Sequence, residues 1–179
     1  ALLSLLAEHS SLAKGVNVTV NKRIHSMKAI QDKMPHNHCY GCGPENEQGL
    51  QLKSYRQDSG ITTATFIPSA HHNAGPKHFL NGGIQATIID CHAICTALGD
   101  AYYRAGRDVG EGEMIWYATG NMDVSYKKPV PIDRPVELTA EIVSSAEKKT
   151  VVSCQLLSGS EVCATAEVIA VKVPNSWYD

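Results

Sequence analysis

Residues 81–98 of the chain read NGGIQATIIDCHAICTAL. From Ile84 to Leu98 this segment contains no Lys, Arg or Glu. A helix that is apolar nearly all round has to be covered on most of its sides by the rest of the fold. Gly99 comes next and is expected to end the helix. The segment therefore predicts one long, buried helix over residues 82–98.

The segments on both sides of this helix have the composition of β-strands. Before it, residues 50–55 alternate in polarity and residues 61–67 are rich in β-branched side chains, with a tight turn between them. After a polar loop, four strand-like runs follow, over residues 114–126, 135–145, 150–157 and 161–173. Short separators join the last three runs as antiparallel hairpins. We expect an α+β fold in which an antiparallel β-sheet wraps around one long central helix, the arrangement known as the hotdog fold.

Length and composition limit the remaining choices. The 179 residues fit one domain with an added arm: residues 1–35 are expected to form an N-terminal helix or arm, and residues 36–179 the hotdog domain. The formal charge is −2 and no segment is densely basic, which argues against nucleic acid and membrane as partners. Six cysteines do not make a disulfide scaffold at this length, so we expect free thiols and a reducing, cytoplasmic setting.

The helix opens with Asn81, Gly82 and Gly83. The first backbone N–H groups of a helix lack partners within it and carry the positive end of the helix dipole. Glycine lets another group approach this backbone closely. Such an end can bind a carbonyl oxygen as it becomes negative, which is the main requirement of acyl transfer. An ordinary helix cap followed by two flexible residues is the alternative that the sequence leaves open.

Asp90 lies in the middle of the same apolar helix. Its neighbours three and four positions away are Ala86, Thr87, Ala93 and Ile94, so no basic side chain of the helix can pair with it. An ionised carboxylate in apolar surroundings is costly unless another group meets it. Three explanations stay open: a wet cleft, a partner from elsewhere in the fold, or a catalytic role that uses a raised pKa.

Gly82 and Asp90 are too far apart to serve one substrate from a single chain. Eight residues of α-helix span about 12 Å, whereas a polarising donor and a base must both lie about 3 Å from one carbonyl group. Two antiparallel copies of the helix across a twofold axis bring the glycine end of one copy to the carboxylate of the other. We therefore expect a homodimer with two equivalent sites at its interface, or a homotetramer made of two such dimers.

Three motifs resemble those of the hotdog-fold acyl-CoA thioesterases of the PaaI-like group. That group carries His-Gly-Gly, about seven residues and a helical Asp, and the corresponding run here is residues 81–90. Residues 39–50 are similar to its Cys-x-x-Cys-Gly…Asn-x-x-Gly-Leu opening, and residues 121–130 to its strand ending in an aromatic residue and Pro. The resemblance covers residues 36–173 and implies hydrolysis of an acyl-CoA to a free carboxylic acid and CoA, with no metal or other cofactor.

The resemblance also implies roles for individual residues. The N–H of Gly82, with Gly83 close by, would polarise the thioester carbonyl, and Asp90 would act from the partner subunit as general base or nucleophile. Thr119 falls where relatives place a strand hydroxyl that orients the attacking water. Asn81 replaces the family's His; an amide can cap the helix but does not titrate near neutral pH, so we expect it to be a hydrogen-bonding scaffold.

Substrate contacts are expected on two other segments. The resemblance suggests that Asn73 corresponds to an assisting Asn before the helix, with His71 or His72 as alternatives for that place. Lys127 and Lys128 are expected to meet the phosphates of coenzyme A, together with Arg134 and with Arg104 or Arg107. A solvated turn is the other interpretation of the two lysines.

Other chemistries are also compatible with parts of the sequence. Residues 36–42 contain His36, His38, Cys39 and Cys42, and a Cys-x-x-Cys pair invites a zinc interpretation. A second ligand pair is missing unless the two histidines complete the set, so a turn packed by two thiols is the preferred interpretation. At the level of function, the alternatives are an acyl-CoA-binding regulatory or scaffold protein on the same fold and, last, a hotdog hydratase.

Overall fold

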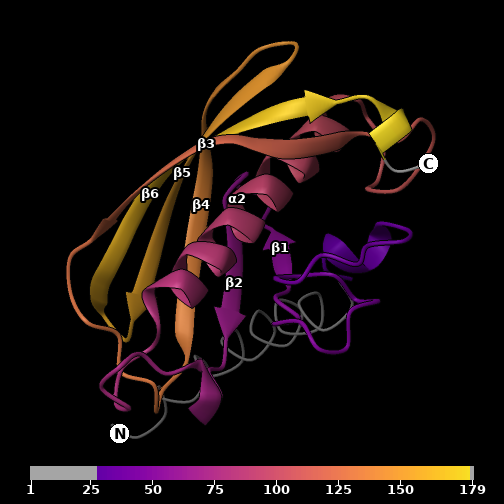
Figure 1. Ribbon diagram of the computed structural model, residues 1–179. Helices are drawn as coiled ribbons and strands as arrows, with labels where there is room; N and C mark the ends of the chain where they lie inside the picture. The colour runs from indigo at the N-terminus through magenta and orange to yellow at the C-terminus, as the bar shows by residue number, and fades with distance from the viewer. Residues whose placement is uncertain (1–27, 178–179) are drawn as a thin grey trace, which may run out of the picture.

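The computed structural model describes residues 28–177, which form one antiparallel sheet and one long helix (Figure 1). The strands are β1 (Ser54–Arg56), β2 (Thr62–Phe66), β3 (Trp116–Tyr126), β4 (Val136–Ser145), β5 (Lys149–Ser158) and β6 (Glu161–Val173). The helix α2 spans Gly82–Arg104, and short 3-10 helices occur at η1 (Gln31–Lys33), η2 (Ala70–His72) and η3 (Asn175–Trp177). The strand order is β1-β2-β4-β5-β6-β3.

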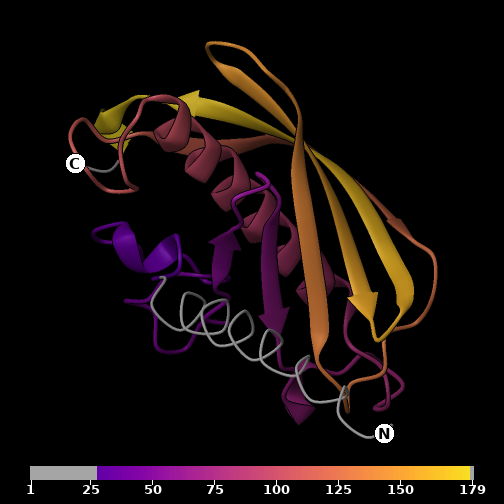
Figure 2. The ribbon, with the colours of Figure 1, turned by 180° about the vertical axis from the view of Figure 1, so that it is seen from behind.

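The sheet curls around α2, which lies along its concave face (Figures 1 and 2). All neighbouring strands pair antiparallel, and α2 contacts every strand. The buried side chains of α2, such as Ile88, Ile89 and Leu98, pack against inward-facing residues of the strands, such as Leu138 and Val152. The hotdog fold expected from the sequence is confirmed, because an apolar helix needs this cover on most sides.

The helix is longer than the sequence indicated. Gly99 does not end it, and α2 continues to Arg104. The glycine serves close packing instead: a Cβ at this position would lie only 3.0 Å from Cδ1 of Ile30. The last turn is polar on its outer side, where Nε of Arg104 donates to Asp100 at 2.7 Å. The first hairpin is shorter than expected, because only three residues of β1 pair with β2.

Residues 28–35 are part of the domain core. Ile30 and Met34 are buried, and the Ile30 N–H donates to the carbonyl of Ser54 at 2.9 Å, along the outer edge of β1. Residues 1–27 lie outside the described part of the chain, so the predicted N-terminal arm over residues 1–35 stays a prediction for that portion.

A buried hydrogen-bond chain ties this segment to the helix. Gln31 donates from Nε2 to the Ser54 hydroxyl at 2.9 Å, and that hydroxyl lies 2.9 Å from Nδ1 of His92. Nε2 of His92 lies 3.1 Å from the carbonyl of Thr62, which can only accept. The imidazole therefore carries its hydrogen on Nε2, and Nδ1 accepts from Ser54. Burial lowers the pKa of His92 to about 4, so the ring is neutral at physiological pH.

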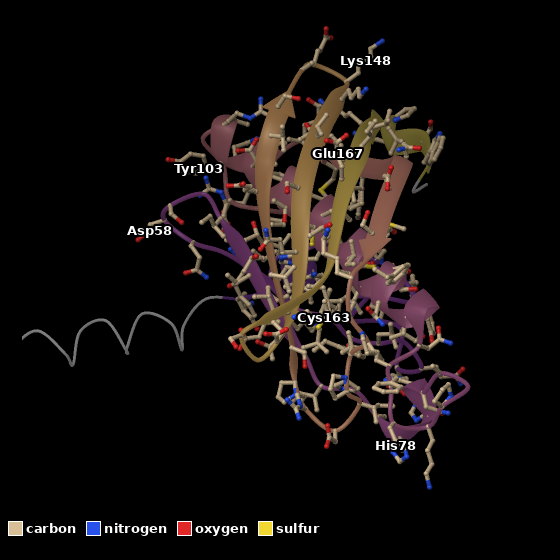
Figure 3. All side chains as sticks on the ribbon, turned by 90° about the vertical axis from the view of Figure 1, so that its left-hand side faces the viewer. Asp58, His78, Tyr103, Lys148, Cys163 and Glu167 are labelled. Carbon is tan, nitrogen blue, oxygen red and sulfur yellow. The ribbon has the colours of Figure 1, made fainter. Side chains whose placement is uncertain are left out.

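The two edges of the sheet differ. The short strand β1 is covered by residues 28–35, whereas no strand among residues 28–177 pairs with the outer side of β3. Most residues of β3 from Thr119 onward are exposed. In Figure 3, Lys148 marks the β4–β5 turn at one end of the sheet, and His78, in the loop before α2, marks the other. No helix among the described residues is long and apolar enough to cross a membrane.

Candidate active site

Asn81 forms the N-terminal cap of α2. Its Oδ1 accepts hydrogen bonds from the backbone N–H groups of Gly83, at 2.7 Å, and Ile84, at 3.3 Å. The N–H of Gly82 has no hydrogen-bond partner among residues 28–177. Gly82 therefore remains as a donor for an outside group, whereas the cap already occupies the N–H of Gly83, which the sequence analysis placed close to the reacting carbonyl.

The loop before the helix fixes this helix end. The N–H of Asn81 donates to the carbonyl of His72 at 2.9 Å, and the His72 ring stacks on Phe66 with 5.4 Å between ring centroids. The amide of Asn73 donates to the carbonyl of Ala74 at 2.8 Å. His72 and Asn73, both expected to contact substrate, thus lie beside the start of α2, where they also hold the loop together.

Tyr126 covers the other side of the helix end, and the sequence analysis assigned it no role. It is the last residue of β3, and its hydroxyl donates to the carbonyl of Gly82 at 2.8 Å. A Cβ on Gly82 would lie 3.7 Å from the Tyr126 ring. In the sequence, Tyr126 is the aromatic residue before Lys127 in the third motif, but only the fold shows that it reaches Gly82.

Asp90 and Thr119 meet in the structure. The Thr119 hydroxyl donates to Oδ1 of Asp90, joining β3 to the middle of α2. The register between β3 and β6 shifts between Thr119 and Asn121, which identifies a bulge at Gly120. A Cβ on Gly120 would lie 2.6 Å from Val171, so glycine lets the bulge pack on β6. Bulges re-aim neighbouring side chains, and this one accompanies the turn of Thr119 toward the helix.

The carboxyl group of Asp90 is half-buried and forms no salt bridge within the described residues. Burial raises its pKa, the hydrogen bond from Thr119 acts in the opposite direction, and the nearby Cys42 raises it again. Of the explanations left open by the sequence, a partner from elsewhere in the fold is thus found, and it is a neutral hydroxyl rather than a cation.

One chain does not bring the two halves of the expected machinery together. Gly82 and Asp90 lie eight residues apart on the continuous helix α2, which corresponds to about 12 Å. The structure therefore groups Asn81, Gly82 and Tyr126 at the helix start, and Asp90 with Thr119 about two turns further on.

The basic residues expected at the mouth of the site are distributed over the molecule. Lys127 and Lys128 directly follow Tyr126, and Nζ of Lys128 pairs with Glu161. Arg104 and Arg107 lie at and beyond the far end of α2, where they bond Asp100 and the carbonyls of Glu111 and Glu113, respectively. Arg134 lies 3.6 Å from Asp133 in the loop between β3 and β4, and Pro131 of this loop pairs with Phe79 just before α2. Lys127, Lys128 and Arg134 thus share the loop that adjoins the start of α2, whereas Arg104 and Arg107 do not.

Four cysteines form a thiol cluster beside Asp90: Cys39, Cys42, Cys91 and Cys95. The first two belong to the turn of residues 39–43, and the other two lie one helical turn apart on α2. Hydrogen bonds from the other three thiols, that of Cys39 foremost, lower the pKa of Cys42. In the zinc interpretation of the sequence, His36 and His38 would complete the set of Cys39 and Cys42, but Nε2 of His38 lies 3.3 Å from Glu45.

Comparison with known proteins identifies the family of the chain. No model of a known protein family matches the chain. A solved structure of a thioesterase superfamily protein from Shewanella loihica PV-4 is 31% identical, with 78% of this chain and 96% of that chain covered and a TM-score of 0.58. The chain therefore belongs to the thioesterase superfamily.

Individual relatives extend this result. The chain is 25% identical over 127 residues to the acyl-coenzyme A thioesterase THEM4 of Mus musculus, covering 71% of this chain and 49% of THEM4, so it spans about half the length of that curated relative. The PaaI protein of the E. coli phenylacetic acid degradation operon shares the fold, with a TM-score of 0.56 at 12% identity over 70% of this chain and 81% of that chain. The predicted resemblance to the PaaI-like hotdog thioesterases is confirmed.

Proposed function

We propose that this protein hydrolyses an acyl-CoA thioester to a carboxylic acid and CoA, in sites shared between two copies of the chain. The observation that carries the proposal is the hydrogen bond from Thr119 to Asp90, a half-buried carboxylate that has no cationic partner among residues 28–177. A base needs such a carboxylate, because an ion pair would reduce its affinity for a proton.

The proposed reaction uses two groups. Asp90 takes a proton from water, whose oxygen attacks the thioester carbonyl carbon. The carbonyl oxygen becomes negative and is stabilised by the free N–H of Gly82 at the positive end of the helix. Collapse of this intermediate breaks the carbon–sulfur bond, and the CoA thiolate leaves and takes up a proton. The Thr119 hydroxyl donates its hydrogen to Asp90. Its oxygen can still accept a hydrogen bond from the attacking water.

A second copy of the chain completes the site in this proposal. The separation of Gly82 and Asp90 along α2 requires an antiparallel neighbour, which gives two equivalent sites per homodimer. The long, exposed edge strand β3 supports this arrangement, because it offers unpaired backbone groups beside Thr119 and Tyr126. The homotetramer made of two such dimers stays a prediction, which a measurement of molecular mass in solution tests.

Substrate binding is proposed at the same end of the molecule. Lys127 directly follows Tyr126 and forms no ion pair among the described residues, so it is available for a phosphate of CoA. Lys128 would have to break its ion pair with Glu161 before it could bind a phosphate of CoA. The reducing, cytoplasmic setting expected from the cysteines also stays a prediction.

The first test is a panel of short, long and aryl acyl-CoAs assayed with wild type and Asp90→Asn. We expect the variant to lose at least about 100-fold in turnover, the usual scale for an acid–base group, while it still binds substrate. Asp100→Asn is the matched control, because Asp100 lies on the same helix but pairs with Arg104. Hydrolysis by Asp90→Asn at the wild-type rate contradicts the proposal.

The second test asks whether the site is shared. Gly82→Pro removes the N–H but keeps a residue suited to the first position of a helix, and Asn81, at φ −59° and ψ 135°, has the conformation that precedes proline. We expect a loss of about 100-fold or more, with Gly82→Ala as the control that keeps the donor.

Mixing the two inactive variants gives the decisive result. In a heterodimer of Asp90→Asn and Gly82→Pro, one site has both native groups and the other has neither. Random pairing should restore about a quarter of the wild-type activity. No recovery in confirmed heterodimers contradicts a shared site. Saturable binding of CoA esters without turnover by the wild type would select the alternative, an acyl-CoA-binding regulatory or scaffold protein.

A further inference from the structure

The thiol cluster lies outside the proposed reaction, although it adjoins Asp90 in the sequence. The sulfur atoms of Cys39, Cys42 and Cys91 all lie within 4.8 Å of one another, and those of Cys39 and Cys91 are 3.6 Å apart. Cys95 lies one turn after Cys91 on α2 and acts on the pKa of Cys42, but its sulfur is not among the three that lie within 4.8 Å of one another. Two segments about fifty residues apart in the sequence thus supply two cysteines each.

The spacing of these sulfurs suits a metal ion better than a disulfide. Zinc binds thiolates at about 2.3 Å in a tetrahedron, which places the sulfurs about 3.8 Å apart. The separation of 3.6 Å between Cys39 and Cys91 is close to this value. A disulfide bond requires a sulfur–sulfur distance of about 2.05 Å, and it would use only two of the four thiols.

The turn that carries Cys39 and Cys42 is shaped to meet the helix. Its ends are joined by the Gly43 N–H, which donates to the Cys39 carbonyl at 2.8 Å. Gly41 lies directly against α2, because a Cβ there would be 2.3 Å from the sulfur of Cys91. Only glycine permits this approach, and it delivers the Cys-x-x-Cys pair, a spacing used by zinc sites, onto the second pair.

We propose that this protein binds one Zn²⁺ ion through the thiolates of Cys39, Cys42 and Cys91, with the side chain of Cys95 turning toward the ion as the fourth ligand. The ion enters from the side of Cys39, which is the exposed member of the set. Its role is structural, because four protein thiolates leave no open position for substrate. The bound ion links the turn of residues 39–43 to α2 at Cys91, which directly follows Asp90. The proposal does not depend on the thioesterase activity and is tested by metal binding alone.

The experiment measures metal in the full chain, purified without a metal-affinity step and kept reduced. We expect about one zinc per chain by elemental analysis. Titration of the metal-free chain with Co²⁺ should give sulfur-to-cobalt charge-transfer bands and the visible bands of a tetrahedral site, both lost when Zn²⁺ is added. Thiol labelling should modify Cys39, the exposed thiol of the cluster, readily only after the metal is removed.

Variants locate the site. Cys42→Ser and the double variant Cys91→Ser/Cys95→Ser should lose stoichiometric binding. Cys154→Ser and Cys163→Ser are the matched controls, because both residues are buried cysteines on strands β5 and β6, and should keep one ion per chain. If a cluster variant fails to fold, the cobalt spectrum of the wild type still decides, because it reports thiolate coordination without any substitution.

Three results count against the proposal. The first is a reduced, folded wild-type chain that takes up no Co²⁺ or Zn²⁺ at micromolar concentrations. The second is binding that survives in Cys91→Ser/Cys95→Ser with unchanged stoichiometry and spectrum. A stable disulfide between Cys39 and Cys91, found by mass spectrometry in a chain that binds no metal after reduction, also counts against it.

Discussion

The hydroxyl of Thr119 and the carboxylate of Asp90 are hydrogen-bonded across the gap between strand β3 and helix α2. Burial raises the pKa of Asp90, and the bond from Thr119 favours the ionised form in opposition to that effect. Thr119 thus supports the charge state that a base needs, and it also fixes the direction in which the carboxylate points.

Replacing Thr119 with Val should reduce kcat, because Val keeps the shape of the side chain but cannot donate. A hydrogen bond to a charged group contributes about 1.5–3 kcal/mol, so we expect a loss of about 10-fold to 100-fold. Thr119→Ser keeps the hydroxyl and should stay close to wild type. Steady-state kinetics on one acyl-CoA compares the two, and equal kcat values for the Val and Ser variants would exclude this role.

The cap of α2 should make a measurable contribution to stability. Asn81→Ala leaves the N–H groups of Gly83 and Ile84 without their side-chain acceptor, so we expect the free energy of unfolding to fall by about 1 kcal/mol. Asn81→Ser can still accept and should lose less. Urea unfolding of the three proteins provides the measurement; an Ala variant as stable as the Ser variant would show that the cap is not needed.

The buried chain from Gln31 to His92 depends on Ser54, which both accepts and donates. Ser54→Ala leaves Nε2 of Gln31 and Nδ1 of His92 unsatisfied in the core. We expect a loss of about 1–3 kcal/mol in the free energy of unfolding. Ser160→Ala, in the exposed β5–β6 turn, is the control and should change little. A Ser54 variant that unfolds at the same urea concentration as this control argues against the network.

The ion pair between Lys33 and Asp108 gives a pH-dependent prediction. Nζ of Lys33 lies 2.7 Å from Oδ1 of Asp108 and lowers the pKa of that carboxyl group. A carboxyl group with a lowered pKa in the folded state stabilises the protein above its unfolded pKa of about 3.9, and this contribution disappears as the pH falls through the folded pKa. The pair is partly exposed, so its contribution is below about 1 kcal/mol.

Comparison of wild type with Asp108→Asn tests this sign. At about pH 7 the wild type should melt at a slightly higher temperature, and near pH 2 the two melting temperatures should coincide. Added salt should narrow the difference at neutral pH, because exposed charges are screened. A difference that grows on acidification would mean that the sign is wrong.

The fold could be predicted from the sequence because its signals are local. An apolar helix without Lys, Arg or Glu and two short separators between strand-like runs are enough for a sheet that wraps around a helix. Gly99 could not be interpreted locally: a glycine after an apolar run is a common helix end, but here Ile30 packs on it. Only the position of a segment nearly seventy residues away decides between these roles.

The site was predicted unevenly for the same reason. Asp90 could be recognised from its own helix neighbours, whereas Thr119 was placed by family resemblance and Tyr126 was not assigned a role. The convergence of Cys39 and Cys42 with the cysteines of α2 depends on how the turn of residues 39–43 folds back onto the helix. Sequence spacing alone carries no information about that contact.

The unequal edges of the sheet have a consequence for assembly. Residues 28–35 shield β1, through the bond from Ile30 to Ser54, whereas β3 offers its outer side to a neighbour. If two copies pair through β3, the unpaired edge strand of each described domain is used in the dimer. The edge that stays exposed to solvent is then β1, which residues 28–35 cover. Further copies then have no unpaired edge strand to add to, so assembly by strand pairing stops at the dimer and does not continue into fibres.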